Sequence, residues 1–164
     1  MMWKFRLATI DDLPDIVQTY NSTIPSRLVT ADTEPVTVES RQTWFKEHNP
    51  ENRPIWVVEY GGKYAGWMAF STFYGRPAYE NTVEISIYLE EAFRKLGLGK
   101  LCIKHAKTEA RKMAIHTLLG FIFAHNTVSI NLFEKSGFQK WALLPAVAKL
   151  DGTLRDLVIM GLKI

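Results

Sequence analysis

Two glycines separated by one residue stand between an apolar strand pattern and an amphipathic helix pattern. The stretch 94–100 reads Arg-Lys-Leu-Gly-Leu-Gly-Lys, after a predicted strand at 83–89 and before a predicted helix at about 99–113. A close glycine pair indicates a backbone that turns sharply or approaches a ligand. Backbone N–H groups at a helix start attract anions, and the flanking cations add positive charge. The loop therefore predicts either a tight turn or an anion site.

Two common nucleotide-binding motifs do not fit this loop. A dinucleotide fingerprint needs a third glycine three residues after Gly99, and Cys102 stands there. A Walker loop needs Ser or Thr directly after Gly-Lys, and Leu101 stands there. The loop alone therefore does not name its ligand.

The rest of the chain shows strand and helix patterns in an irregular order. Strand 83–89 has apolar residues at odd positions, so Glu84, Ser86 and Tyr88 share its other face. The order predicts an α/β (α+β) fold with helices packed around one sheet, not a doubly wound repeat. The other expected elements are a strand at 5–8, a helix from Asp11 or Asp12 to about 21, a long loop at 22–37, a helix at 38–48, a hairpin of 55–60 and 63–70, a strand at 118–124, a helix from Asn126 or Thr127 to 135, and strands at 138–144 and 154–162.

Composition excludes several classes of protein. The chain has 164 residues, of which 47% are hydrophobic, and this predicts one domain with one core. A net charge of +3 with dispersed cations does not indicate a nucleic-acid partner. No apolar stretch approaches the roughly 20 residues of a membrane span, and the start lacks signal-peptide features, so we expect a cytoplasmic protein without a membrane partner. One cysteine and four dispersed histidines predict no disulfide and no metal site.

Two motifs together resemble the GCN5-related N-acetyltransferase (GNAT) superfamily. YLEEAFRKLGLGKLCIKHA (88–106) resembles its pyrophosphate loop, Arg-x-x-Gly-x-Gly, with the preceding strand and following helix. HNTVSINLFEKSGF (125–138) resembles its downstream Asn-x-x-Ser segment, and FRLATIDDL resembles its opening. The resemblance implies a single N-acetyltransferase domain over 1–164, built on one mixed, mostly antiparallel twisted sheet flanked by helices on both faces. It also implies acetyl-CoA as co-substrate and acetyl transfer to an amine.

A further segment resembles the phosphinothricin and methionine sulfoximine acetyltransferase subfamily. GRPAYENTVEISIYL (75–89) carries an aromatic, Tyr79, shortly before a Thr-x-Glu-x-Ser-x-Tyr strand. TADTEP (30–35), followed by Trp44-Phe45 and His48, also looks like that subfamily. This resemblance implies a small amino-acid-like acceptor, such as phosphinothricin, methionine sulfoximine or methionine sulfone, and a homodimer. Trp141 and the apolar residues after it could form the subunit contact.

Glu84 is the candidate general base. An amine must be neutral to attack a thioester, so a carboxylate on a strand facing the cleft could take its proton. Partial burial would raise the pKa of Glu84 toward a useful range. The alternative from the residues alone is a solvated or ion-paired strand glutamate. The subfamily resemblance favours the base, because its proposed base matches this position.

The resemblance also implies how the cofactor is held. The strand end would bind the pantetheine arm in β-strand fashion and supply a backbone N–H to the oxyanion. The loop would hold the pyrophosphate with main-chain N–H groups. Asn126 would bond the pantetheine amides or serve as a helix cap, and Lys135 would lie near the cofactor or simply favour a helix end. The implied cofactor-binding residues are Ile87, Tyr88, Leu89, Arg94, Lys95, Leu96, Gly97, Leu98, Gly99, Lys100, Asn126 and Lys135.

Position 133 departs from many relatives, which place a tyrosine there to protonate the leaving thiolate. This chain has Phe133, so a side-chain acid is not expected at that point. The candidate acceptor-binding residues are Arg27, Arg76, Tyr79 and Arg155, because arginine grips a carboxylate bidentately and Tyr79 could close over a substrate. Each arginine taken singly is more often a solvated surface residue.

Two alternatives stay open. The acceptor could be another amine, namely a polyamine, an aminoglycoside or a protein N-terminus, although few acids surround positions 75–82. The domain could also be a non-catalytic acyl-CoA-binding module. Phe133 favours this second alternative, and the presence of Glu84 argues against it.

Overall fold

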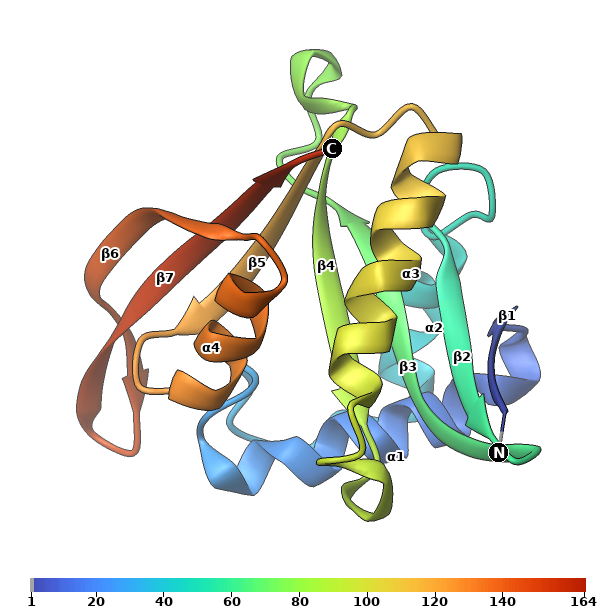
Figure 1. The fold of residues 1–164 in the computed structure, drawn as a ribbon. Helices are drawn as coiled ribbons and strands as arrows, with labels where there is room; N and C mark the ends of the chain where they lie inside the picture. Colours follow the sequence, from blue (N-terminus) through green and yellow to red (C-terminus); the bar gives the residue numbers. More distant parts are fainter. Residues whose placement is uncertain (1) are drawn as a thin grey trace.

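The computed structural model describes residues 2–164 and forms one mixed sheet flanked by helices (Figure 1). The seven strands lie in the order β1-β2-β3-β4-β5-β7-β6, and β4–β5 is the parallel pair in an otherwise antiparallel sheet. The expected sheet is therefore confirmed. The strands are β1 (Trp3–Leu7), β2 (Ile55–Tyr60), β3 (Lys63–Thr72), β4 (Thr82–Leu89), β5 (Thr117–Phe123), β6 (Gln139–Leu150) and β7 (Thr153–Lys163). The helices are α1 (Leu13–Thr23), α2 (Val38–Lys46), α3 (Leu98–Lys112) and α4 (Thr127–Lys135).

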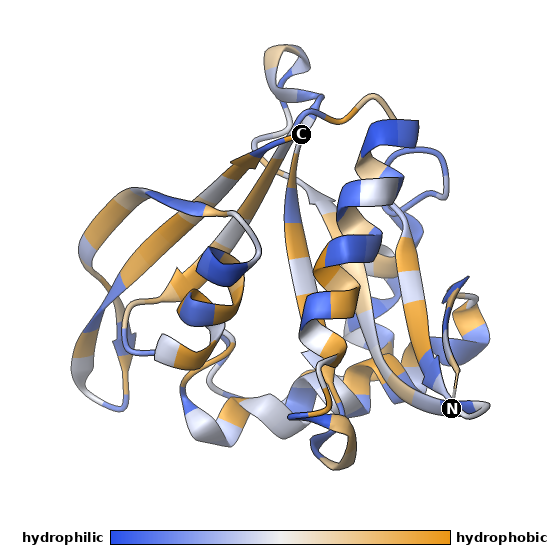
Figure 2. Cartoon of the chain, viewed as in Figure 1, coloured by the Kyte–Doolittle hydropathy of each residue, from blue (hydrophilic) through white to orange (hydrophobic). Residues whose placement is uncertain are grey.

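The helices cover both faces of the sheet, as expected. Helices α3 and α4 lie on one face, and α1 and α2 lie on the other (Figure 1). Residues Cys102, Ala106 and Ala110 recur at helical spacing on α3 and are fully buried. In Figure 2 the α3 ribbon accordingly alternates between hydrophobic and hydrophilic patches. The second cluster places Leu13 and Ile16 of α1 against Trp67 of β3.

Strands β4 and β5 part after a short paired stretch. Their pairing covers the rows from Thr82↔Thr117 to Glu84↔Leu119. On the other side of β4, pairing with β3 continues to Leu89. The N–H of Glu90 donates to the Ala65 carbonyl, and antiparallel rows alternate in their bonding. The N–H and C=O groups of odd-numbered β4 residues therefore point toward β5, and beyond Ile85 they face the gap.

One boundary differs substantially from its prediction. Strand β6 continues to Leu150, six residues beyond the expected end at Leu144. Pro145 directly follows the expected end, and proline has no N–H to donate to a neighbouring strand. Strand β6 is an edge strand, where that group is not needed, and the pairing register shifts between Leu144 and Ala148 to accommodate it. The chain at 24–26, expected as loop, forms a 3-10 turn that continues α1.

Candidate active site

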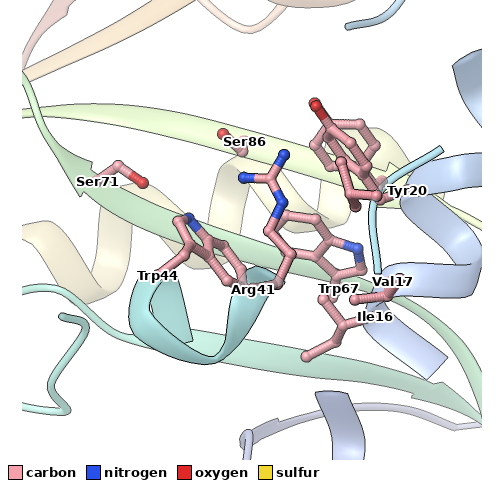
Figure 3. A pocket seen from close by; sticks show the side chains of 10 residues that line it. Ile16, Val17, Tyr20, Arg41, Trp44, Trp67, Ser71 and Ser86 are labelled. Atoms are coloured by element: carbon pink, nitrogen blue, oxygen red, sulfur yellow. The ribbon is translucent and has the colours of Figure 1, made fainter. Parts of the chain in front are cut away.

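A pocket lies on the face of the sheet covered by α1 and α2 (Figure 3). The side chain of Arg41 on α2 extends into it, between aromatic rings from three elements. Trp67 and Tyr88 stack on neighbouring strands with ring centroids 4.7 Å apart. The pocket is thus an aromatic enclosure with one cation. Its lining comprises Ile16, Val17, Tyr20, Val36, Arg41, Trp44, Trp67, Ser71, Ser86 and Tyr88.

Arg41 is held in place by a small polar network. Its Nη2 donates to Oδ2 of Asp32 at 2.8 Å, and its guanidinium lies 5.1 Å from the centre of the Tyr20 ring. The Tyr20 hydroxyl donates to the same Asp32 carboxylate. Burial and the bond to Asp32 raise the pKa of Tyr20 to about 12, so the phenol keeps its proton. The remaining guanidinium N–H groups are the cationic donors of the pocket.

Glu84 lies beside this pocket without lining it. It pairs across the sheet with Ser71, and both Ser71 and Ser86 line the pocket. Among residues 2–164 no side chain forms a hydrogen bond or ion pair with the Glu84 carboxylate. Burial raises its pKa above the ordinary range, because the charged form is poorly solvated there. This half-buried, unpaired carboxylate has the properties of a base.

The glycine loop turns the chain from β4 into α3. Gly97 has a φ of +79° and directly precedes the helix, which begins at Leu98. Leu98 is buried and fixes the first turn against the core. The other expected loop ligands, Arg94, Lys95, Leu96 and Lys100, are exposed, and Gly99 is partly so. The first turn of α3 therefore lies at the protein surface. The helix itself provides no partner for the backbone N–H groups of that turn.

The two glycines serve different purposes. A Cβ on Gly97 would meet nothing within 4 Å, so this position requires glycine for its left-handed backbone. A Cβ on Gly99 would lie 2.8 Å from Cδ2 of Leu132, so this position allows α3 to approach α4. The Nε of Arg94 donates to the Leu89 carbonyl at 3.1 Å, which ties the loop to the end of β4.

Asn126 and Lys135 lie at opposite ends of α4. The Asn126 side-chain oxygen accepts from the N–H of Ser129 at 3.2 Å, and its amide donates to the Leu28 carbonyl at 3.2 Å. Asn126 is therefore a helix cap that also anchors the loop after α1. Lys135 is exposed in the last turn of α4.

Phe133 is a packing residue of α4. It is buried, contacts Phe138 with ring centroids 4.7 Å apart, and lies against Gly120 of β5. A phenylalanine in this place offers no acidic hydrogen. The phenylalanine at position 133, where many relatives have a tyrosine, therefore makes an apolar packing contact.

None of the expected acceptor-binding residues lines the pocket. Arg27 forms an ion pair with Asp151 at 2.9 Å, so it links the loop after α1 to the β6–β7 turn. Arg76 and Tyr79 lie in the exposed connection between β3 and β4. The ring centroids of Tyr79 and Phe73 are 5.7 Å apart there. Arg155 is on β7, opposite Ala148 of β6.

Sequence reasoning did not single out Arg41. Its spacing gives a signal, because residues three and seven positions after it are Trp44 and His48, on the same face of a helix. Trp44 was noted only as part of a resemblance, and Tyr20 lies in the first predicted helix. Their convergence depends on how α1 and α2 pack on the sheet.

The family model described as "Acetyltransferase (GNAT) family" matches residues 15–138. This chain belongs to the GNAT family. The GNAT chain is similar to the Bacillus subtilis protein YwnH, which is provisionally named a phosphinothricin acetyltransferase. The two sequences are 51% identical over 157 residues, which cover 95% of this chain and 96% of YwnH. Its relatives are acetyltransferases by name, so this protein is an N-acetyltransferase.

Two further comparisons extend this likeness. A Pseudomonas paraeruginosa L-methionine sulfoximine/L-methionine sulfone acetyltransferase is 28% identical over 165 residues, covering 100% of this chain and 96% of its own. The structure of yncA from Salmonella typhimurium, provisionally named an acetyltransferase and solved with its cofactor acetyl-CoA, superposes with a TM-score of 0.89. It is 27% identical, with 98% of this GNAT chain and 93% of the other covered. Within residues 2–164, no helix combines the length and apolarity needed to cross a membrane.

Proposed function

We propose that this GNAT protein transfers the acetyl group of acetyl-CoA to the amine of a small amino-acid-like substrate. The observation that carries the proposal is the parting of β4 from β5 next to the unpaired Glu84 carboxylate and a pocket that holds Arg41. The named activity of the Pseudomonas relative, with methionine sulfoximine and sulfone, supports an acceptor of this size and charge.

The parted strands and the glycine loop fit the shape and chemistry of acetyl-CoA. The odd-numbered residues Ile87 and Leu89 have backbone groups that face the gap, and a pantetheine arm carries amides that can bond to them. The first turn of α3 offers N–H groups to a diphosphate, with Arg94, Lys95 and Lys100 adding charge. The cofactor of yncA supports this assignment.

The residues around the gap divide the chemistry between them. Bound acetyl-CoA supplies an activated acetyl thioester. Glu84 accepts the proton of the incoming ammonium, since its raised pKa brings it closer to that of an amine. The Ile87 N–H, facing the gap, is placed to donate to an oxygen that gains negative charge. Phe133 is buried against Gly120 and supplies no acidic hydrogen.

The pocket supplies the acceptor site. The Arg41 guanidinium matches a carboxylate, and the rings of Trp44, Trp67 and Tyr88 enclose an apolar side chain. The exposed Arg76 and Tyr79 can contact the acceptor only if the β3–β4 connection folds toward the pocket. An amino acid has both a carboxylate for Arg41 and a side chain for the aromatic rings.

We further propose a homodimer, as the subfamily resemblance implies. Four large apolar side chains of the β6–β7 edge are exposed: Trp141, Leu143, Val147 and Leu154. Several exposed apolar side chains on the same two strands favour a protein contact. Sedimentation equilibrium is expected to give twice the chain mass, and charged substitutions at Leu143 and Val147 are expected to give the monomer.

Thiol release from acetyl-CoA tests the proposed function directly. The panel consists of amino acids, methionine sulfoximine, methionine sulfone, phosphinothricin, polyamines and aminoglycosides. We expect turnover with at least one carboxylate-bearing amine, and turnover lower by about a hundredfold or more in Glu84→Gln. Turnover confined to polyamines or aminoglycosides would contradict the proposed acceptor, and no turnover with any amine would contradict the enzyme.

A further inference from the structure

His48, just after α2, connects the acceptor pocket to a second hollow. Its Nδ1 lies 2.8 Å from the Trp44 carbonyl, which can only accept, so Nδ1 carries a hydrogen. Its Nε2 lies 3.2 Å from Oγ of Ser71 on β3. In the neutral ring Nε2 is then an acceptor, and the Ser71 hydroxyl donates to it. The direction of this bond is fixed by the Trp44 carbonyl.

Like Trp44, Ser71 lines both hollows. It lines the acceptor pocket together with Ser86, and it also lines a second hollow formed by Trp44, Glu47, His48, Arg53 and Thr72. On the sheet it stands directly opposite Glu84, with both side chains on the same face. Ser71 thus separates the unpaired carboxylate from the imidazole.

The surroundings of His48 favour its neutral form. Burial lowers the pKa of the ring, while the bond to the Trp44 carbonyl and the charge of Glu47 oppose that shift and Arg53 adds to it. Glu47 follows α2, and Arg53 precedes β2, so both face the ring from the second hollow. A neutral imidazole at physiological pH is ready to take a proton.

We propose that Ser71 and His48 form a proton relay that carries the acceptor's proton from Glu84 to solvent. The inference rests on the proposed function, in which an ammonium becomes an amide and one proton is released per turnover. Glu84, protonated by the ammonium, passes a proton through a bridging water to Oγ of Ser71, because the two side chains are not in direct hydrogen-bond contact, while the Ser71 hydroxyl passes its own proton to Nε2 of His48. The carboxylate and the hydroxyl are then restored, and His48 holds the proton as an imidazolium. Water in the second hollow removes it from Nε2.

The relay makes a specific kinetic prediction. Ser71→Ala and His48→Gln are each expected to lower kcat about tenfold or more, within the usual range for assisted proton transfer, with KM for acetyl-CoA unchanged. Because the two residues act in series, the double variant is expected to be no slower than the slower single variant. Added imidazole buffer is expected to restore much of the kcat of Ser71→Ala. Ser71→Thr, which keeps the hydroxyl, is expected to retain most of the activity.

Matched variants separate the relay from a packing role. Thr72→Val removes the bond from Arg53 Nε to Thr72 Oγ1 in the same hollow without touching the relay, and is expected to keep wild-type kcat. Wild-type kcat in Ser71→Ala, a loss that buffer does not restore, or additive losses in the double variant would each overturn the relay. If the wild type turns over and Ser71→Ala equals it, the relay alone fails. Absence of wild-type turnover overturns both proposals.

Discussion

Gly120 of β5 and Phe133 of α4 are so close that a Cβ on Gly120 would lie 2.5 Å from Cε1 of the ring. The ring is buried and cannot move away without disturbing Phe138. Gly120→Ala is therefore expected to lower the free energy of unfolding by about 1–3 kcal/mol, as overpacking does. Urea denaturation followed by circular dichroism measures the change.

A second substitution checks the cause of that loss. Phe133→Leu shortens the side chain that the new methyl group would meet, so the double variant Gly120→Ala/Phe133→Leu is expected to be more stable than the sum of the two single losses predicts. Strict additivity of the two losses would show that the contact is not the cause.

Glu84→Gln is expected to reduce kcat by about a hundredfold or more, because an amide cannot accept the ammonium proton. The rise in melting temperature caused by acetyl-CoA is expected to persist, since Glu84 does not contribute to the cofactor gap. In the wild type, kcat/KM is expected to climb from pH 6 to 8.5 as Glu84 and the amine lose protons. A flat profile, or a variant with normal turnover, would remove Glu84 from this role.

The same substitution is expected to stabilise the protein at neutral pH. The pKa of Glu84 is raised on folding, so over a range of pH the native state binds a proton that the unfolded chain has lost. Stability contributed by this group therefore falls as pH rises above the unfolded pKa of about 4.3 and through the raised folded value. Melting temperatures at pH 7 and pH 4 test this: Glu84→Gln should exceed the wild type at pH 7 and lose that advantage at pH 4.

Gly97→Ala tests the left-handed start of α3. The φ of +79° disfavours a side chain, so we expect a loss of about 1–2 kcal/mol in stability and a higher KM for acetyl-CoA. Gly97→Asn is the matched control, because asparagine tolerates this conformation better. Equal effects of Ala and Asn on both quantities would contradict a conformational cause.

Arg41→Met is expected to raise KM for a carboxylate-bearing acceptor about tenfold or more, because a hydrogen bond to a charged group contributes about 1.5–3 kcal/mol. The same amine without its carboxylate is expected to show a much smaller change. Arg111→Met, on the exposed face of α3, serves as the control and should leave both values unchanged. A similar rise for both amines would show that Arg41 shapes the pocket without binding the carboxylate.

The order of elements could be predicted because the local signals agree. The Gly61-Gly62 turn, the odd apolar positions of β4 and the glycine-led α3 each fixed one unit of the sheet. The extension of β6 past Pro145 could not, since the tolerance for proline depends on the strand being at an edge. Strand order at the edge is a property of the whole sheet.

The candidate site was predictable along β4 and much less so on the helices. Glu84 belongs to a strand whose alternation reveals which side chains share a face. The place of Arg41 in the pocket, and of His48 against Ser71, depends on how α2 packs over β3, about which α2 alone carries no information. Arg27 illustrates the converse: a plausible ligand by type forms an ion pair with Asp151, 124 positions away.

Strands β4 and β5 pair only in the rows near Glu84, so the sheet consists of two parts that are joined at one end of these strands. A ligand that bonds to the exposed edge of β4 takes the place of a strand and connects the two parts of the sheet. The architecture thus links occupancy of the gap to stiffness of the whole protein. Under the proposed function, acetyl donor and acceptor meet near the paired rows, and the open end of the gap admits and releases the long carrier.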